Sequence, residues 1–362
     1  MIKTTTKKIC IIVSSLGGGG AERSSALLSE ILHDLGYDIH IVSVLDIIDY
    51  PFKGKLLNLG KLKAKNDTSF GRIKRLIVFK KYLKQHRFDY IIDCRTRIGF
   101  LKELIIIKYA YFGFKCIYLF HSYKVESYIH PNKVLGRFLY AKGYKIVAVS
   151  KGIKAKLENK YDLNNVVVVY NSLDVELEES LEKPANKYVL FYGRLDDKIK
   201  NITLLLNAYK SSVLSEKSID LMILGSGNDL EALKLLTHRL ELEKHVHFLP
   251  YKSNPYKTVQ NAIFTVLTSR YEGFPMVIPE SLALGVPVVS VDCNSGPNEI
   301  IINEENGLLV ENHNVEALAE AMNRLIVDKE LYLHCKSNTK ASVAHLSKNN
   351  IGKQWQSLLN DE

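Results

Sequence analysis

The sequence has few of the features that tie a chain to a disulfide-rich, metal-binding or membrane-spanning class. Its five cysteines are scattered and odd in number, which indicates reduced thiols in a cytoplasm rather than a disulfide framework or a zinc site. No stretch approaches the roughly 20 apolar residues of a spanning helix, since charges interrupt the most hydrophobic one, 101–114. The apolar run 9–13 leads into glycines, so we expect a first strand rather than a signal peptide.

Further absences narrow the function. There is no internal repeat, no low-complexity tract beyond the glycines, and no recognisable motif for binding RNA or DNA, so we expect no nucleic-acid partner. No cluster of Asp and His has the spacing of a divalent-metal site, so we expect no cofactor and no required metal. At 362 residues the chain exceeds the usual limit of one hydrophobic core, and two domains are expected.

Charge is divided unevenly along the chain. Residues 1–170 hold 30 Lys and Arg against 13 Asp and Glu, a net +17, whereas the remainder holds 19 against 26, a net −7. A basic half favours a polyanionic partner: nucleic acid, an anionic membrane surface or a phosphorylated acceptor. Within it, 70–85 has helical periodicity: cations surround an apolar side made of Phe70, Ile73, Leu76, Ile77 and Tyr82. Both an interfacial helix on anionic lipid and an ordinary amphipathic helix fit this pattern.

The order of elements predicts an α/β protein with two parallel, doubly wound sheets. Apolar runs rich in β-branched residues alternate with helical patterns from end to end. For the first sheet we expect strands at 8–14, 37–45, 87–93, 115–120, 145–150 and 166–170. For the second we expect strands at 188–194, 220–227, 246–250, 262–269, 287–292 and 307–310.

The stretch 267–287 places two glutamates eight positions apart across a loop-to-helix junction. Glu272 follows a buried strand, and Glu280 lies about one turn into the helix expected at 276–284. Ligands of open α/β sheets bind at the carboxyl ends of the strands, so both carboxylates are expected in that crevice. Three interpretations stay open: a solvated pair, the acid and nucleophile of a glycosidase, or carboxylates that accept hydrogen bonds from sugar hydroxyls.

Two further motifs suit a phosphate. Gly17 to Gly20 lie between the first strand and a helix, where backbone N–H groups can meet an anion, although four glycines also fit a flexible turn. A dinucleotide fingerprint fits poorly, because Glu22 or Arg23 stands where its last glycine belongs. Arg194 and Lys200 follow a strand and are suited to clamp a diphosphate, with Lys198 a rival for the lysine.

The run SRYEGFPMVIPESLALGVPVVS resembles the signature of the retaining, nucleotide-sugar-dependent glycosyltransferases of family 4. The tracts SLGGGGAER and GRLDDKIKNITLLLNAY resemble the glycine loop and the diphosphate pair of that family. The resemblance is strong over 188–310 and looser before it. It implies a GT-B fold of two facing Rossmann-like domains with an interdomain cleft: 1–171 binds the acceptor, 172–187 is a linker, 188–346 binds the nucleotide sugar, and 347–362 is a helix that crosses back.

The resemblance also implies roles for individual residues. Toward the donor, it places Gly19, Gly20, Arg194 and Lys200 at the diphosphate, Leu249 at the base, Glu280 at the ribose, and Glu272 with Gly273, Phe274, Pro275 and Met276 at the sugar. His121 lies beside that sugar, and Tyr123 and Lys124 follow toward the acceptor. Glu272, His121, Arg194 and Lys200 are the predicted catalytic residues.

The predicted reaction is retaining transfer of a hexose or N-acetylhexosamine from a UDP-linked donor. The expected acceptor is a glycan of a bacterial O-antigen, capsule or lipooligosaccharide. It is either linked to a lipid, such as a polyprenyl diphosphate, or part of a growing chain. The basic domain predicts a cytoplasmic enzyme, peripheral on the inner face of the membrane. A glycoside hydrolase-like protein and a non-catalytic polyanion-binding protein are the alternatives; release of nucleoside diphosphate would exclude the first.

Overall fold

The computed structural model describes residues 6–63, 67–175 and 186–361. The chain divides into two compact units: unit 1 is Met1–Ser172 with Lys348–Glu362, and unit 2 is Leu173–Ser347. Most of the linker expected at 172–187 lies outside the described residues. No helix in the described part of the chain is long and apolar enough to cross a membrane.

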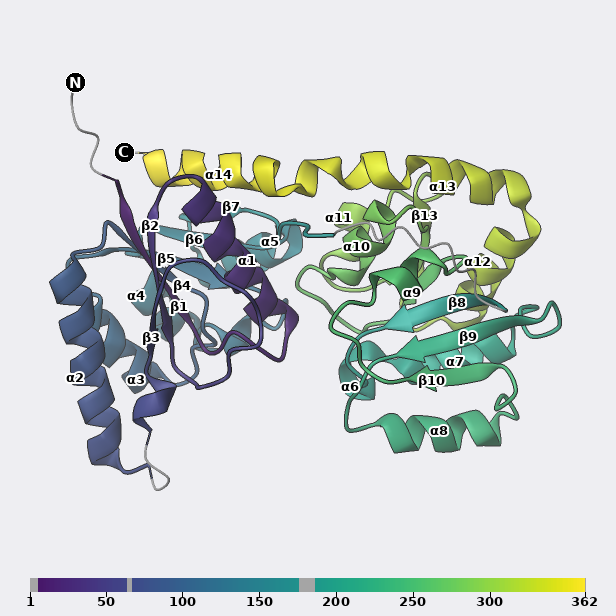
Figure 1. The fold of residues 1–362 in the computed structure, drawn as a ribbon, viewed down its shortest axis with the longest axis horizontal. Helices are drawn as coiled ribbons and strands as arrows, with labels where there is room; N and C mark the ends of the chain where they lie inside the picture. Colours follow the sequence, from purple (N-terminus) through teal and green to yellow (C-terminus); the bar gives the residue numbers. More distant parts are fainter. Residues whose placement is uncertain (1–5, 64–66, 176–185, 362) are drawn as a thin grey trace. The chain divides into compact units, whose positions relative to one another are not determined.

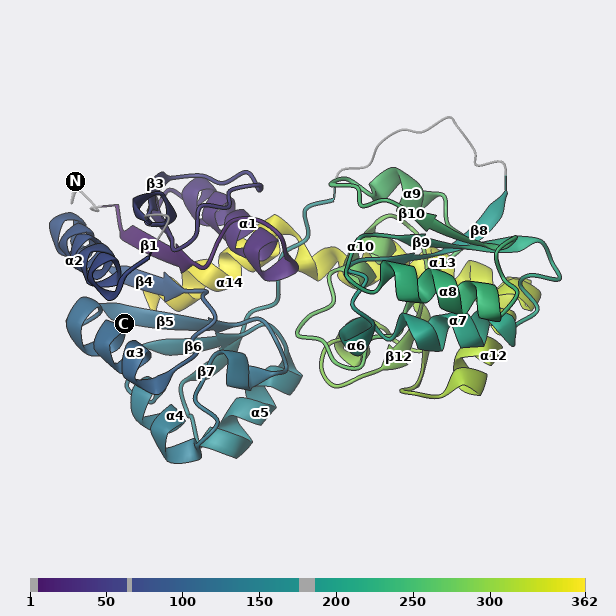
Figure 2. The same cartoon turned by 90° about the horizontal axis from the view of Figure 1, so that it is seen from below.

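Unit 1 is a seven-stranded parallel sheet of order β3-β2-β1-β4-β5-β6-β7, with helices on both faces (Figures 1 and 2). Its strands are β1 Lys8–Val13, β2 Asp38–Ser43, β3 Lys55–Asn58, β4 Tyr90–Asp93, β5 Lys115–Phe120, β6 Lys145–Ala148 and β7 Val166–Val168. Its α-helices are α1 Gly20–Asp34, α2 Ser69–His86, α3 Phe100–Ile105, α4 Lys133–Tyr140, α5 Lys151–Tyr161 and α14 Lys348–Asn360. Short turns are η1 Gly60–Leu62, the π-helical η2 Ile106–Ala110, and η3 Val125–Ser127.

Unit 2 is a six-stranded parallel sheet of order β10-β9-β8-β11-β12-β13. Its strands are β8 Lys187–Tyr192, β9 Ile219–Leu224, β10 Val246–Leu249, β11 Thr265–Leu267, β12 Val288–Asp292 and β13 Gly307–Glu311. Its helices are α6 Asp197–Lys200, α7 Ile202–Lys210, α8 Leu230–Arg239, α9 Tyr256–Gln260, α10 Val277–Ala283, α11 Pro297–Ile300, α12 Val315–Val327, α13 Lys329–Val343 and η4 Ala344–Leu346. The predicted pair of doubly wound parallel sheets is confirmed.

The chain-terminal helix α14 belongs to unit 1. It packs against α1, where Gly352 lies close to Ile31 and Leu35, and its Trp355 is buried. The phenolic O–H of Tyr90 in β4 donates to the carbonyl of Leu359 at 2.8 Å. These contacts join the last residues of the chain to the first sheet.

Some boundaries differ from the sequence-based expectation for local reasons. The short strand β3 was not expected, because KLLN lies in a basic stretch and is only half-buried at the sheet edge. The strand expected at 87–93 begins at Tyr90 instead, since Arg87 ends α2 in the left-handed region with φ 52°. The run 202–214 predicts one helix by its spacing of apolar residues, whereas α7 ends at Lys210.

The position of the candidate site follows from the topology. All strands of a sheet are parallel, so all their carboxyl ends meet at one edge. The strand order reverses between β1 and β4 in unit 1 and between β8 and β11 in unit 2. The loops that follow these four strands therefore flank the crevices where open α/β sheets bind ligands.

Candidate active site

The predicted donor residues of unit 2 come from loops at one edge of its sheet. Arg194 follows β8, Lys200 ends α6, and Glu272 lies in the loop between β11 and α10. Leu249 ends β10 at the same edge. The parallel topology thus gathers residues that are up to 78 positions apart in the sequence, from Arg194 to Glu272.

An ion pair between Lys200 and Glu272 forms the centre of this edge. The Lys200 ammonium donates to Glu272 Oε1 at 2.6 Å, and the two side chains are 22% and 13% exposed. The hydroxyl of Ser269 donates to the same oxygen at 2.6 Å. The carboxylate is therefore oriented by two donors, and the pair remains open to solvent. Ser269 is the first residue of the SRYEGFP motif, but the sequence alone did not predict a role for it.

The backbone around α6 separates the two rival lysines. After α6 the chain turns at Asn201, which has φ 51° in the left-handed region. The hydroxyl of Thr268 holds the carbonyl of Lys200 at 2.8 Å, and the Arg270 guanidinium donates to the Asn201 side chain at 2.7 Å. Lys198 is exposed and lines a separate depression with Asp197, Thr203, Asp229 and Arg270. The structure therefore brings Lys200, and not Lys198, to Glu272.

The loop that carries Glu272 rests on the loop after β12. The Glu272 N–H donates to the Asn294 carbonyl at 3.2 Å, and the Ser295 hydroxyl donates to the Gly273 carbonyl at 3.0 Å. Gly296 has φ 107°, and a Cβ there would collide with Pro275, so this contact requires glycine. Phe274 is buried.

The second glutamate is enclosed more deeply. Glu280 lies in the first turn of α10 and is 6% exposed. The start of α10 is joined to the central sheet, because the Tyr192 hydroxyl of β8 donates to the carbonyl of Val277 at 2.7 Å. Met276 is half-buried just before α10. Leu249 is half-buried and packs in the same apolar cluster as Val277, and its carbonyl accepts the Gly225 N–H at 3.0 Å.

In unit 1 the glycine run opens onto a helix start. Gly19 is the N-cap of α1, the helix begins at Gly20, and no side chain caps it. The first N–H groups of a helix have no carbonyl partner within it, and together with the helix dipole they attract anions. A Cβ on Gly20 would meet only open space. The helix start is therefore open, as a phosphate site requires.

His121 follows β5 with its imidazole turned inward. Both ring nitrogens are buried and have no hydrogen-bond partner among the residues described. Burial, and then the nearby charge of Arg97, lower the pKa of His121 to about 4, so the ring is neutral at pH 7. Tyr123 lies beside Lys156, whose ammonium is 4.5 Å from the ring centre, and Lys124 is exposed.

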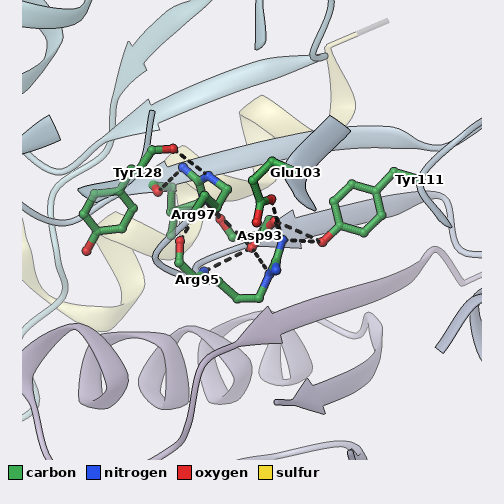
Figure 3. Close-up of polar contacts among 7 residues, drawn as sticks. Asp93, Arg95, Arg97, Glu103, Tyr111 and Tyr128 are labelled. Carbon is green, nitrogen blue, oxygen red and sulfur yellow. Dashed lines mark hydrogen bonds and ion pairs between the residues drawn. The ribbon is translucent and has the colours of Figure 1, made fainter. Parts of the chain in front are cut away.

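The sequence-based prediction missed a buried charge cluster after β4 (Figure 3). Arg95 donates to both carboxylate oxygens of Asp93, at 2.9 and 2.7 Å, and to Glu103 at 3.1 Å. Tyr111 donates to Asp93 at 2.9 Å. All four residues are at most 5% exposed. Charged residues directly after a buried strand were the available signal, since such positions lie at the ligand-binding edge.

Arg97 extends this cluster to the neighbouring strand and loop. Its guanidinium donates to the carbonyls of Asp93, Leu119 and Tyr128 at 2.8, 3.0 and 3.2 Å, so it ties the ends of β4 and β5 to the segment after η3. Burial by itself would raise the pKa of Asp93, but the two guanidinium charges hold it below its usual value. The pKa of Glu103 is raised by burial.

Metal ligands do not gather in the described part of the chain: no group of three His, Cys, Asp or Glu side chains could hold an ion there.

Known proteins resemble both units. The model for "Glycosyltransferase Family 4" matches residues 18–177, and that for "Glycosyl transferases group 1" matches residues 174–342. An uncharacterized glycosyltransferase of Haemophilus influenzae is 30% identical over 63% of this chain and 64% of its own length. A Campylobacter jejuni relative is 29% identical over 96% of this chain and 98% of its own; its name is N-acetylgalactosamine-N,N'-diacetylbacillosaminyl-diphospho-undecaprenol 4-alpha-N-acetylgalactosaminyltransferase.

Solved structures show the same fold. A TarM mutant from S. aureus, crystallised with fondaparinux, alpha-GlcNAc-glycerol and UDP, superposes with a TM-score of 0.80 at 16% identity, over 98% of this chain and 100% of that one. At this identity the likeness shows the fold alone, which is GT-B. Since the two family models together span residues 18–342, the chain belongs to the family 4 type of glycosyltransferases.

Proposed function

We propose that this glycosyltransferase moves a hexose or N-acetylhexosamine from a UDP-sugar to a lipid-linked or growing glycan of a bacterial surface polysaccharide, with retention at the anomeric carbon. The observation that carries the proposal is the solvent-open Lys200–Glu272 pair at the edge of unit 2. A carboxylate oriented by two donors suits sugar hydroxyls, and an adjacent ammonium suits the diphosphate that leaves. The Campylobacter relative, whose name contains a diphospho-undecaprenol-linked sugar, supports the acceptor class.

We assign the donor to unit 2. Arg194 and Lys200 stabilise the charge that develops on the leaving diphosphate, and Glu272 with the N–H groups of the 273–276 loop holds the sugar. Glu280, enclosed in α10, binds the ribose hydroxyls, and the backbone around Leu249 binds the base. Because two cations and backbone N–H groups supply this stabilisation, the reaction proceeds without a divalent metal.

We assign the acceptor to unit 1, where Tyr123 and Lys124 contact it. Gly19, Gly20 and His121 also lie on unit 1, and their contact with the donor stays a prediction of the family resemblance. A neutral His121 can exchange hydrogen bonds with a sugar without adding charge. The net +17 of the basic half supports an acceptor at an anionic membrane. We propose that the enzyme works on the cytoplasmic face of that membrane.

The test is a panel of nucleotide sugars given to the full chain with and without a chelator. We expect saturable release of UDP from one UDP-hexose or UDP-N-acetylhexosamine, unchanged by EDTA, and an α-linked product by NMR when an undecaprenyl-diphosphate glycan is supplied. Release from a donor with another base would overturn the UDP assignment. Loss with EDTA and recovery with Mg²⁺ would overturn metal independence, and an inverted product would overturn retention.

A further inference from the structure

Helix α2 of unit 1 is apolar on two opposite sides. Phe79 and Leu83 are buried against the unit. Phe70, Ile73 and Ile77 point the other way and are 76%, 55% and 52% exposed. Large apolar side chains that gather on one exposed side of a helix mark an interaction surface, so we expect a partner on the outer side of α2. The residues Phe70, Ile73 and Ile77 therefore lie on the solvated side of α2 and not on the side that packs against the unit.

The continuous helix of α3 and η2 repeats this arrangement. Its inner side buries Ile106 and Ala110. Its outer residues Leu101, Ile105 and Tyr109 recur at a spacing of four, and Phe112 follows in the turn after η2. These four residues are 71%, 52%, 41% and 81% exposed. Four large apolar side chains in one outward line are more than the scattered surface residues of a soluble protein.

The two outer lines belong to one surface. Helix α2 packs on η2, where the Lys80 ammonium lies 3.3 Å from the ring centre of Tyr109. Helix α3 packs on α4, where the ring centres of Phe100 and Phe138 are 6.4 Å apart. Tyr109 and Phe138 are themselves exposed, so the surface continues across both junctions. We name it the α2–α4 face, with the apolar residues Phe70, Ile73, Ile77, Leu101, Ile105, Tyr109, Phe112, Val134 and Phe138.

Cations predominate on this face. Four of them are paired with carboxylates at its borders, Arg72 and Arg75 with Asp67, and Lys133 and Arg137 with Asp162. The segments 69–86, 98–115 and 133–142 contain 12 Lys and Arg and a single carboxylate. That carboxylate is Glu103, which is 1% exposed and paired with Arg95 inside the unit. Two copies of the chain joined by a two-fold axis through this face would bring these cations against one another. The partner that fits is apolar and anionic at once.

We propose that the α2–α4 face is seated on an anionic bilayer, with its apolar side chains in the interfacial region and its cations at the level of the lipid phosphates. The inference deepens the proposed function and rests on it in one respect, namely that the acceptor is lipid-linked. Burial of apolar area and attraction to anionic headgroups both contribute to such binding, and only the second weakens as salt rises.

The first experiment is co-sedimentation of the full chain with phosphatidylglycerol or phosphatidylcholine vesicles at low and high salt. We expect binding to the anionic vesicles and a fraction that persists at high salt. The variant Leu101→Gln/Ile105→Gln/Phe112→Ser should need at least about tenfold more lipid for half-maximal binding and lose the salt-resistant fraction. Replacement of Lys74, Lys81, Lys84 and Lys102 with Gln should reduce binding mainly at low salt.

The matched control lies on unit 2. Leu235, Val327 and Leu333 are 59%, 65% and 51% exposed, close to the values on the α2–α4 face. Their joint replacement by Gln should leave vesicle binding unchanged. A second readout is quenching by brominated lipid: Phe112→Trp should be quenched and Leu235→Trp should not. The native Trp355 is 3% exposed and gives both proteins the same background.

Equal vesicle binding by the triple apolar variant and the wild type would overturn the proposal. So would a wild-type dimer that the same variant converts to a monomer without loss of lipid binding, because the occupant would then be a second copy. UDP release from a UDP-sugar in vesicle-free solution is measured on the same preparations. Vesicle binding without that turnover refutes the proposed function alone, and turnover without vesicle binding refutes this inference alone.

Discussion

The two units share a topology and differ in almost everything that their surfaces present. Both sheets are parallel, and their first six strands follow one order, with β7 added in unit 1. Residues 348–362 add two Lys against one Asp and one Glu, so unit 1 keeps the net +17 and unit 2 the net −7. Large exposed apolar residues concentrate on α2, α3–η2 and α4 of unit 1. One scaffold thus presents an acidic body and a basic, apolar one, because surface residues vary without disturbing the sheet.

The same edge of each sheet also carries different electrostatics. In unit 2 the Lys200–Glu272 pair is partly exposed, so either partner can exchange its contact for a ligand. In unit 1 the cluster of Asp93, Arg95 and Arg97 is buried, and its side chains form hydrogen bonds with other groups of the protein. A place at the switch point therefore does not by itself leave a charged group accessible to a ligand. In unit 1 burial commits Asp93, Arg95 and Arg97 to contacts within the protein.

The largest effect on stability is expected from a substitution in the buried charge cluster of unit 1. Arg97→Met leaves four backbone carbonyls without this donor and Asp93 with less compensation, so the free energy of unfolding should fall by about 3–5 kcal/mol. Urea unfolding measures it. The matched control is Arg324→Met, whose ion pair with Glu304 is about half exposed and should contribute under about 1 kcal/mol. Similar losses in both variants would contradict this interpretation of the buried charge cluster.

The next effect concerns the open pair of unit 2. In the proposed reaction Lys200 and Arg194 stabilise the leaving diphosphate, so Lys200→Ala or Arg194→Ala should lower turnover by roughly 100-fold or more. Lys198→Ala is the control, because Lys198 lines a different depression, and it should retain near-wild-type turnover. Steady-state release of nucleoside diphosphate measures all three. A silent Lys200→Ala beside a damaging Lys198→Ala would reverse the assignment.

The burial of His121 in unit 1 should have a smaller effect, which is seen in how stability depends on pH. The pKa of His121 is lowered from 6.5 to about 4 in the folded protein. Between these two pH values the unfolded chain binds a proton at His121 and the folded chain does not. Stability is full above pH 6.5 and should fall by up to roughly 2–3 kcal/mol toward pH 4. His121→Gln should remove this part of the pH dependence. Parallel stability profiles of the two proteins over pH 4–7 would show that His121 is solvated.

The smallest effect separates the two glutamates. Glu280→Gln keeps the size of an enclosed side chain and removes its charge, so it should weaken UDP binding by roughly tenfold. Glu272→Gln should leave UDP binding nearly intact and reduce turnover of the UDP-sugar. Calorimetric titration of UDP and turnover on the same preparations measure the difference. Equal UDP affinity in both variants and in the wild type would refute this division of roles.

Most of the architecture followed from local patterns. Apolar runs such as 8–14 and 115–120 predicted strands because β-branched residues fill the interior of a parallel sheet. The half-buried edge strand β3 was not predicted, since its four residues KLLN include no β-branched residue. The glutamate motif pointed to a ligand edge, because a strand, a glycine-containing turn and a helix follow one another there in sequence.

Contacts between distant residues were decided only in three dimensions. The sequence by itself determined which residue types stand at the ends of strands, as local propensity and spacing are properties of neighbours along the chain. It left Lys198 and Lys200 as rivals, and only the folded structure shows that Lys200 contacts Glu272, 72 residues away. It also left open whether Phe70, Ile73 and Ile77 face a core or the solvent. Helical periodicity defines a face, but only packing against other elements decides which face is covered.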